Sequence, residues 1–337
     1  MRSPARQPTM ADVAARAGVS HQTVSRVLND LPGVREETAL RVQQAIAELG
    51  YRRNRSARLL ASRRSGLVGV ATWGTSHFGP QQTQLQLDLA AREAGFRLTT
   101  VAIRDLVIDD VREAVDELLE QGVEAVVLLL PHDSVVRFVQ QVELGVPVVV
   151  VEGDPSRTPL SVAVDNVQGA RLATRHLLEL GHHTVTHVAG PPGWAQTAAR
   201  IEGWRTELEE WGRPVPPLRW GGDWSADSGF AAGSALARER EVTAVFTAND
   251  QMAMGLMAAL REAGRRVPAD VSVVGFDDLA ESVYFDPPLT SVRQDFGELG
   301  RRSMSLVTRA LAGEVGPVVD LVPTQLVVRA STARWAS

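Results

Sequence analysis

Acidic and amide side chains stand at the ends of several apolar runs in the body of the chain. Asn249 and Asp250 follow one such run, Asp277 and Asp278 end another, and Glu152 follows a third. Carboxylates and amides hydrogen-bond the paired hydroxyls of a sugar, and a carboxylate pair also serves as acid and nucleophile in glycoside hydrolysis. The residue types therefore allow two kinds of chemistry, carbohydrate binding and carbohydrate cleavage.

Binding is favoured over cleavage. A paired Asp at a strand end is more often a hydroxyl ligand or a helix cap, and nothing in the sequence indicates a raised carboxylate pKa. The sequence has no G-x-S-x-G, H-E-x-x-H or G-x-G-x-x-G motif, no Cys and no Lys. His182, His183 and His187 lack the spacing of a helical zinc motif. We therefore expect no enzyme activity, no cofactor and no metal.

A second group of chemically capable residues lies near the N-terminus. His21, Gln22, Ser25 and Arg26 would share the start of a short helix, with Asn29 at its end. Arg bonds guanine through two atoms and Gln pairs with adenine, and each good pair discriminates bases by about 1 to 3 kcal/mol. These five residues are predicted to contact double-stranded DNA.

The charge is distributed in a way that fits this reading. Residues 1–64 contain 12 Arg against 5 acidic residues, whereas the remainder contains 23 Arg against 35 acidic residues. A basic head thus precedes an acidic body, and 337 residues suffice for more than one domain. No apolar run approaches the roughly 18 residues of a membrane helix, and the N-terminus shows no signal-peptide pattern. We expect a cytoplasmic protein without a membrane partner.

The head has the pattern of three short helices. Thr9 can cap a first helix that ends at Gly18, Ser20 can cap a second helix over residues 21–29, and a third is predicted over residues 36–49. The short break between the first two helices is typical of a helix-turn-helix. The head is therefore predicted to be an all-α helix-turn-helix headpiece.

The body alternates apolar runs with helical patterns. Runs buried on both faces are typical of parallel strands in a doubly wound sheet, where ligands bind beyond the carboxyl ends of the strands. Thr72, Trp73 and Pro131 join the strand-end candidates named above. The predicted strands are 67–71, 98–101, 125–130, 148–151, 161–164, 185–189, 244–246 and 271–275. The predicted helices are a stretch through 89–94, then 111–119, 134–142, 169–180, 199–211 and 251–263.

Longer motifs give a family resemblance. ADVAARAGVSHQTVSRVLND and ALRVQQAIAELGYRRNRSARLLA resemble the DNA-binding head and hinge of the LacI/GalR family of transcriptional regulators. GDWSADSGF at 222–230, ANDQMAMG at 248–255, SVVGFDD at 272–278 and PPLTSVRQDFGELG at 287–300 extend the resemblance over nearly the whole chain. In this family the body has the fold of periplasmic binding proteins.

The resemblance implies a division of the chain. Residues 8–52 would form the helix-turn-helix domain, 53–65 a hinge helix or linker, and 66–331 an α/β periplasmic-binding-protein-like core of two doubly wound subdomains that binds effector and dimerises. The N-subdomain would comprise about 66–164 and 296–322, and the C-subdomain about 165–295 and 323–331.

The resemblance also implies roles for particular residues. In the hinge, the family pattern assigns DNA contacts to Asn54, Arg55, Ala57 and Leu60, with Leu60 as a wedge in the minor groove. The implied effector-binding residues are Trp73, Phe78, Glu152, Arg200, Trp224, Asn249, Asp277, Gln294 and Phe296. The expected function is a repressor that binds a pseudo-palindromic operator as a homodimer and is released by a small carbohydrate.

The identity of the effector stays open at this point. A galactoside is one candidate, and another glycoside or a corepressor is the alternative. A more remote alternative is that the protein is a sugar-binding protein or a glycosidase with no role in DNA binding. Relative to the family's galactoside-binding pattern, Leu129 replaces an amide, Val164 a Phe and Trp73 a Ser, so the pocket is expected to differ. His21 replaces a Tyr on the recognition helix, which affects the expected operator sequence.

Overall fold

The computed structural model describes residues 8–28, 31–51, 65–73, 77–130, 132–154, 157–314, 316 and 318–335. Contacts divide the chain into two units, Met1–Ser65 and Gly66–Ser337. Within the described residues, every helix is too short or too polar to cross a membrane. The two units are best considered one at a time, because each has its own apolar core.

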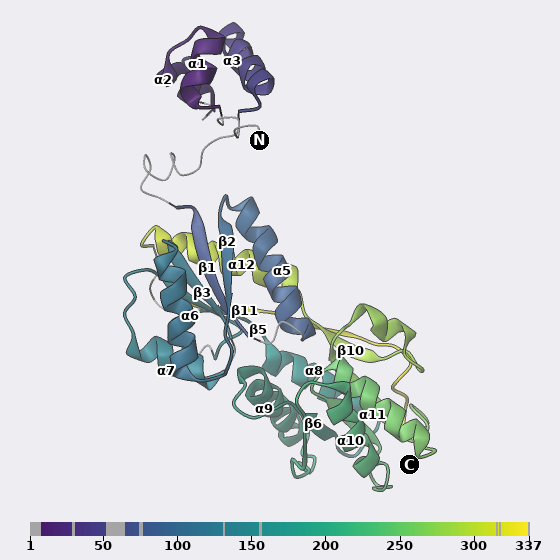
Figure 1. Ribbon diagram of the computed structural model, residues 1–337. Coiled ribbons are helices and arrows are strands. Elements are labelled where there is room, and N and C mark those ends of the chain that lie inside the picture. Colours follow the sequence, from purple (N-terminus) through teal and green to yellow (C-terminus); the bar gives the residue numbers. More distant parts are fainter. Residues whose placement is uncertain are drawn as a thin grey trace, which may run out of the picture. The chain divides into compact units, whose positions relative to one another are not determined.

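The first unit contains the three helices of the headpiece (Figure 1). They close on a small core whose members come from all three helices and from Tyr51, two residues after the third helix. The helices are α1 (Met10–Ala17), α2 (His21–Leu28) and α3 (Glu36–Leu49). The most deeply buried side chains are Val13, Val24 and Val42. The structure confirms the predicted helix-turn-helix.

The helix ends are capped as the sequence predicts. The Thr9 side chain accepts a hydrogen bond from the backbone of Asp12, and the Asp12 carboxylate accepts one from the backbone of Thr9. The Ser20 hydroxyl accepts a hydrogen bond from the Thr23 backbone at 3.1 Å. Gly18 ends α1 in the left-handed conformation with φ 64°. Such caps set the helix boundaries because they satisfy backbone groups that the helix leaves free.

The second unit consists of two α/β lobes (Figure 1). The first lobe has a six-stranded parallel sheet in the order β11-β5-β4-β3-β1-β2. Helices α5 and α12 share a core on one face, and α6 and α7 on the other. The strands are β1 (Leu67–Thr72), β2 (Arg97–Ala102), β3 (Ala125–Leu129), β4 (Val148–Val151), β5 (Leu160–Val164) and β11 (Val318–Val322). The helices are α5 (Phe78–Glu93), α6 (Ile108–Glu120), α7 (Asp133–Gln141) and α12 (Phe296–Leu311).

The second lobe repeats this plan. Its six strands lie in the order β12-β10-β9-β8-β6-β7, and only β12 is antiparallel to its neighbour. Helices α8 and α9 cover one face of the sheet, and α10 and α11 the other. The strands are β6 (Thr186–Ala189), β7 (Trp220–Gly221), β8 (Ala244–Thr247), β9 (Ser272–Asp277), β10 (Thr290–Arg293) and β12 (Gln325–Val327). The helices are α8 (Asn166–Glu179), α9 (Ala195–Glu210), α10 (Ala226–Leu236), α11 (Asp250–Glu262) and the 3-10 helix η1 (Ala280–Tyr284).

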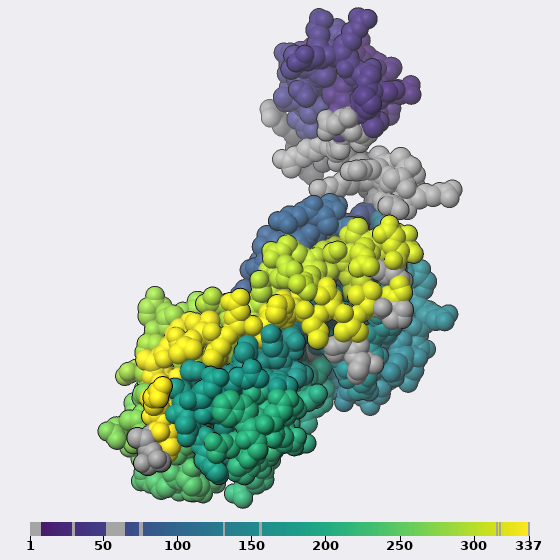
Figure 2. Space-filling model, turned by 180° about the vertical axis from the view of Figure 1, so that it is seen from behind, coloured from purple at the N-terminus to yellow at the C-terminus, as the bar shows by residue number. Residues whose placement is uncertain are grey.

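The chain passes between the lobes three times, from β5 to α8, from β10 to α12 and from β11 to β12. Figure 2 shows the C-terminal part of the chain, in yellow, extending over both lobes. Two doubly wound lobes joined in this way have the architecture of periplasmic binding proteins. The predicted fold class is therefore confirmed.

Several elements differ from the pattern-based expectation. Helix α9 begins at Ala195, four residues before the predicted start, because the polar residues that precede Ala199 hide its first turn. Helix α10 was not predicted, since its ADSGFAAGSAL sequence has small residues in place of an apolar stripe. These small residues let α10 lie very close to α11.

We expect Gly255→Ala to lower the free energy of unfolding of the second unit by about 2 kcal/mol, the usual cost of an overpacked core. A Cβ at Gly255 on α11 would lie 1.8 Å from the Ala226 carbonyl oxygen of α10, so the helices would have to separate. Urea unfolding measures the change. Gly316→Ala is the matched control, because a Cβ at Gly316 meets nothing within 4 Å. Equal stability of the two variants would contradict the prediction.

Candidate functional site

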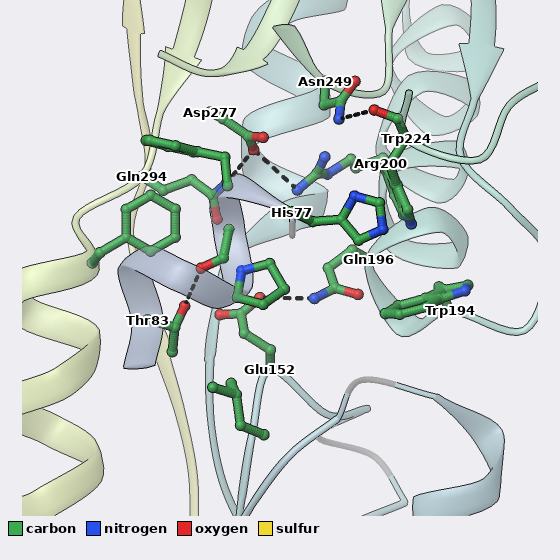
Figure 3. Close-up of a pocket in the computed structure, with 15 residues that line it drawn as sticks. His77, Thr83, Glu152, Trp194, Gln196, Arg200, Trp224, Asn249, Asp277 and Gln294 are labelled. Carbon is green, nitrogen blue, oxygen red and sulfur yellow. Dashed lines mark hydrogen bonds and ion pairs between the residues drawn. The ribbon is translucent and has the colours of Figure 1, made fainter. Parts of the chain in front are cut away.

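A pocket lies where the carboxyl ends of the two sheets face each other (Figure 3). In the first sheet the strand order reverses between β1 and β3, and in the second between β6 and β8. These are the switch points at which open α/β sheets bind ligands. The space, including its opening to solvent, is about 610 Å³. It is lined by His77, Phe78, Gly79, Pro80, Thr83, Leu129, Glu152, Trp194, Gln196, Arg200, Trp224, Asn249, Asp277, Gln294 and Phe296.

Most of the predicted effector residues meet in this pocket. Eight of the nine line it, namely Phe78, Glu152, Arg200, Trp224, Asn249, Asp277, Gln294 and Phe296. Trp73 is the exception: it is not among the lining residues, and its ring lies 5.3 Å from the Trp194 ring and 6.1 Å from the His77 ring. Trp73 thus packs against two residues that form the wall, and its predicted contact with the effector stays a prediction.

Helix starts position several of the lining side chains. His77, Trp194 and Asn249 are the N-cap residues of α5, α9 and α11, and Phe296 is the first residue of α12. The Asn249 amide makes two hydrogen bonds within the protein: its oxygen accepts one from the Met252 backbone, and its nitrogen donates one to the Trp224 carbonyl at 3.0 Å. Asn249 thus holds the Trp224 loop in place.

The backbone is strained at the pocket. Within the described part of the chain, the non-glycine residues with positive φ are Glu152 at 64°, Trp224 at 73°, Asp277 at 106° and Asp278 at 51°. Each such conformation costs about 1 to 3 kcal/mol and persists only where the surroundings enforce it. Three of these four residues line the pocket. Strain concentrated in this way is typical of a ligand site.

A buried arginine forms the centre of the site. The Arg200 Nε donates to the Asn166 side-chain oxygen at 2.9 Å, and its Nη1 donates to the Ala248 carbonyl. Its Nη2 lies 3.9 Å from a carboxylate oxygen of Asp277. The guanidinium carbon lies 3.7 Å from the centre of the Phe276 ring. Arg200 is therefore held on all sides and presents its charge to the pocket.

Burial shifts the titration of the groups around Arg200. It raises the pKa of Asp277 to about 7, although Arg200 opposes the shift, and Gln294 donates a hydrogen bond to Asp277 at 2.5 Å. Burial also raises the pKa of Glu152, partly offset by a hydrogen bond from the Val164 backbone at 2.8 Å. The same burial lowers the pKa of Arg200. Burial thus makes the charged forms of Asp277, Glu152 and Arg200 unfavourable in the pocket.

Two other strand-end carboxylates have structural roles. Asp250 is buried, accepts a hydrogen bond from the Ser291 hydroxyl at 2.6 Å, and has its pKa raised to about 6 by burial. Asp278 binds Arg293 and Arg329, each at 2.6 Å. Since neither lines the pocket, the carboxylates that remain in it are Asp277 and Glu152.

Four lining residues with polar or aromatic side chains were not predicted. His77, Thr83, Trp194 and Gln196 were not among the predicted effector residues. Trp194 and Gln196 follow β6 after a Pro-Pro-Gly turn, so the strand-end rule that selected Asn249 would also have found them. They were missed because α9 was expected to start later.

The DNA-reading candidates on α2 lie partly as predicted. His21, Gln22 and Arg26 are exposed, whereas Ser25 is half-buried. The Arg26 guanidinium donates a hydrogen bond to the Pro32 carbonyl at 2.6 Å. Arg26 therefore contacts the loop after α2 through one of its N–H groups. The remaining candidates lie outside the described residues: Asn29, Asn54, Arg55, Ala57 and Leu60.

The histidines of the second lobe pack against other side chains. The His187 ring is stacked on Phe246 with centres 4.6 Å apart, and its Nδ1 hydrogen-bonds the Phe246 carbonyl. His182 hydrogen-bonds the Thr243 hydroxyl. The part of the chain that the structure describes contains no group of three or more potential ligands placed for a metal ion.

Comparison with known proteins identifies the family. Residues 9–54 match the model of the bacterial regulatory proteins of the lacI family, and residues 174–332 match a periplasmic binding protein-like domain. The chain is 36% identical over 327 residues to the lactose operon repressor of Escherichia coli, covering 96% of this chain and 90% of that protein. The chain belongs to the LacI family. Members of this family are transcriptional regulators and not enzymes. The alternative that the protein is a glycosidase is therefore wrong.

Other LacI-family proteins are similar over the same length. The regulator CelR of Thermobifida fusca is 36% identical over 339 residues, which is 97% of this chain and 98% of that protein. A crystal structure of the lac repressor dimer bound to operator and the anti-inducer ONPF superposes with a TM-score of 0.86 at 34% identity, covering 97% of this chain and all of that chain. A CelR-cellobiose complex gives 0.72 at 34% identity, covering 96% and 99%. This LacI-family chain therefore combines a DNA-binding head with a sugar-binding type of core.

We expect Asp277→Asn to stabilise the ligand-free protein more at pH 8 than at pH 5. The pKa of Asp277 is about 7 in the folded state against an ordinary 3.8, so its protonated form favours folding. That contribution is present below pH 3.8 and is lost as the pH rises through about 7. Thermal melting of both proteins from pH 5 to 8.5 measures the difference. A difference that is constant over this range would show that Asp277 does not titrate there.

Proposed function

We propose that this LacI-family regulator represses transcription from a pseudo-palindromic operator, which it binds as a homodimer, and that a small carbohydrate in the pocket releases it. The observation that carries the proposal is the buried Arg200 and Asp277 beside the Trp224 ring. Guanidinium, carboxylate and amide groups pair with neighbouring sugar hydroxyls, and an indole packs on the C–H face of a pyranose.

The similarity to two kinds of sugar regulator leaves two effector candidates. A galactoside is favoured by similarity to the lactose operon repressor, and a β-glucoside by similarity to the regulator solved with cellobiose. The apolar Leu129 side chain lines the pocket at the end of β3, so a ligand hydroxyl at that wall would lack a partner there. A corepressor, which would tighten operator binding instead, is the alternative outcome of the same titration.

Release requires that the pocket be coupled to the operator. The lining residues come from both lobes, and the Gln196 amide of the second lobe donates to Glu152 of the first at 3.3 Å. A ligand that changes how the lobes close changes the surface of the first lobe, whose strand β1 follows the predicted hinge. The coupling is reciprocal, so operator DNA must lower the affinity for the sugar by the same factor by which the sugar lowers the affinity for DNA. The free energy of such a coupling is typically about 1 to 3 kcal/mol.

Exposed apolar side chains support the proposed homodimer. They lie on α5, α11 and η1, and their exposure would be relieved by a second copy of the chain. They are Leu85, Leu89, Met254, Val283 and Tyr284. A two-fold dimer presents two copies of α2, which fits two half-sites of a pseudo-palindrome.

We expect Arg26→Ala and Gln22→Ala to relax the sequence preference of operator binding and to leave sugar affinity unchanged. Both side chains are exposed on α2, and loss of a paired contact to one base costs about 1 to 3 kcal/mol at that base only. Selection from random duplex DNA, followed by fluorescence anisotropy, measures the preference. Arg97→Ala, an exposed arginine on β2, is the control. Equal weakening on every sequence would assign Arg26 to phosphate contact.

We expect Trp224→Ala to give a repressor that stays on its operator when sugar is added. The variant removes the ring that faces Arg200 at 5.6 Å, and with it the apolar wall for the sugar. Operator release is followed by anisotropy during titration with galactosides and glucosides. Trp211→Ala is the control, because Trp211 is 41% exposed and does not line the pocket. Normal release by Trp224→Ala would remove Trp224 from the effector site.

A further inference from the structure

The loop that follows α2 is bonded twice to one residue of that helix. The Leu31 backbone N–H donates to the Arg26 carbonyl at 3.0 Å. The Arg26 Nη2 donates to the Pro32 carbonyl at 2.6 Å. Both the backbone and the side chain of Arg26, in the last turn of α2, are thus held by this loop.

Gly33 lies against the same guanidinium group. A Cβ on Gly33 would lie 3.1 Å from the Arg26 Nη2 and 3.7 Å from the guanidinium carbon, so the side chain would have to move. The Gly33 backbone also has a φ of 99°, which glycine adopts at little cost. Gly33 therefore allows the loop to approach Arg26 in two ways, by its lack of a side chain and by its backbone conformation.

The guanidinium stays at the surface although it is bonded to the loop. Arg26, Pro32 and Gly33 are all exposed. A guanidinium has five N–H groups in one plane, and the bond to Pro32 uses one of them. The other four suffice for the two acceptors of a guanine. A side chain that is already restrained loses less conformational freedom when it binds a base.

We propose that residues 31–33 position Arg26 for base reading: the Pro32 carbonyl holds the guanidinium in one orientation, and Gly33 makes room for it. This rests on the proposed reading of operator DNA by α2 and assigns Gly33 a role that acts through Arg26. A guanidinium held in one plane distinguishes guanine by geometry. A loosely held one also binds nearby phosphates, which carry no sequence information. The loop therefore sets how well Arg26 discriminates between bases.

The full chain is tested with the duplex that it selects from random DNA, in which each base pair is then replaced in turn. Fluorescence anisotropy measures the affinity of each duplex for the unaltered protein and its variants, and Arg26→Ala identifies the base pair that Arg26 reads. Gly33→Ala should lower discrimination at that base pair about fivefold and leave the others unchanged, because its Cβ displaces the guanidinium. In an Arg26→Ala background, Gly33→Ala should cause no further loss.

Gly50→Ala is the matched control. Gly50 also has a positive φ, 59°, but a Cβ there would meet nothing within 4 Å. This variant should melt at a lower temperature because of backbone strain and keep full discrimination. Gly33→Asn is the second test variant, since Asn tolerates a positive φ better than Ala does and carries a Cβ at the same point. It should lose the same discrimination as Gly33→Ala with less loss of stability.

Three results with the Gly33 variants would overturn the proposal. They are full discrimination by both variants, equal weakening on every duplex, and an effect that persists in the Arg26→Ala background. The proposal is also overturned if Arg26→Ala itself weakens all duplexes equally, because Arg26 would then contact phosphate only. If the unaltered protein selects no duplex at all, the proposed operator binding fails instead.

Discussion

The site depends on the enclosure of one guanidinium group. Arg200 comes from α9, yet it bonds the side chain of Asn166 on α8 and the backbone at the end of β8, and it lies on the ring of Phe276 in β9. A buried cation is tolerated only when hydrogen bonds and opposite charge surround it. Asp277 supplies the nearest charge, and its own burial explains why its pKa moves toward neutrality. The polar network of the pocket is thus the set of groups that make a buried arginine possible.

The strained residues around the pocket are likewise held in place by their surroundings. Glu152, Trp224 and Asp277 each hold a left-handed backbone conformation that a non-glycine residue rarely adopts. Hydrogen bonds from Val164 and Gln294 fix two of these side chains, and Asn249 fixes the carbonyl of the third. The packing of the lobes therefore offsets the cost of this backbone strain and keeps the pocket surface rigid and preorganised. Such a surface loses little conformational freedom when a ligand arrives.

Sequence patterns predicted the fold well where local chemistry decides the structure. Caps such as Thr9 and Ser20 and end residues such as Gly18 act within one turn, so their helices could be read directly. Apolar runs such as β3, buried on both faces, were equally clear. Helix α10 could not be read, since its small residues matter only through contact with α11. Trp194 and Gln196 were missed for a related reason: their place in the pocket depends on the first turn of α9 and on the opposite lobe. The packing of the Trp73 ring against the Trp194 ring could not be predicted, because the strand-end rule ignores ring contacts.

The threefold passage of the chain between the lobes has a mechanical consequence. Because three connections join the lobes, any change in their relative orientation must be accommodated in all three. A protease that cuts one connection would leave two covalent links, and the nicked protein would still present both halves of its pocket to a ligand. The same redundancy keeps each lobe at a high effective concentration for the other. Folding of either lobe also requires segments that are distant in the sequence, because β11 and α12 complete the first lobe only after the second has been traversed.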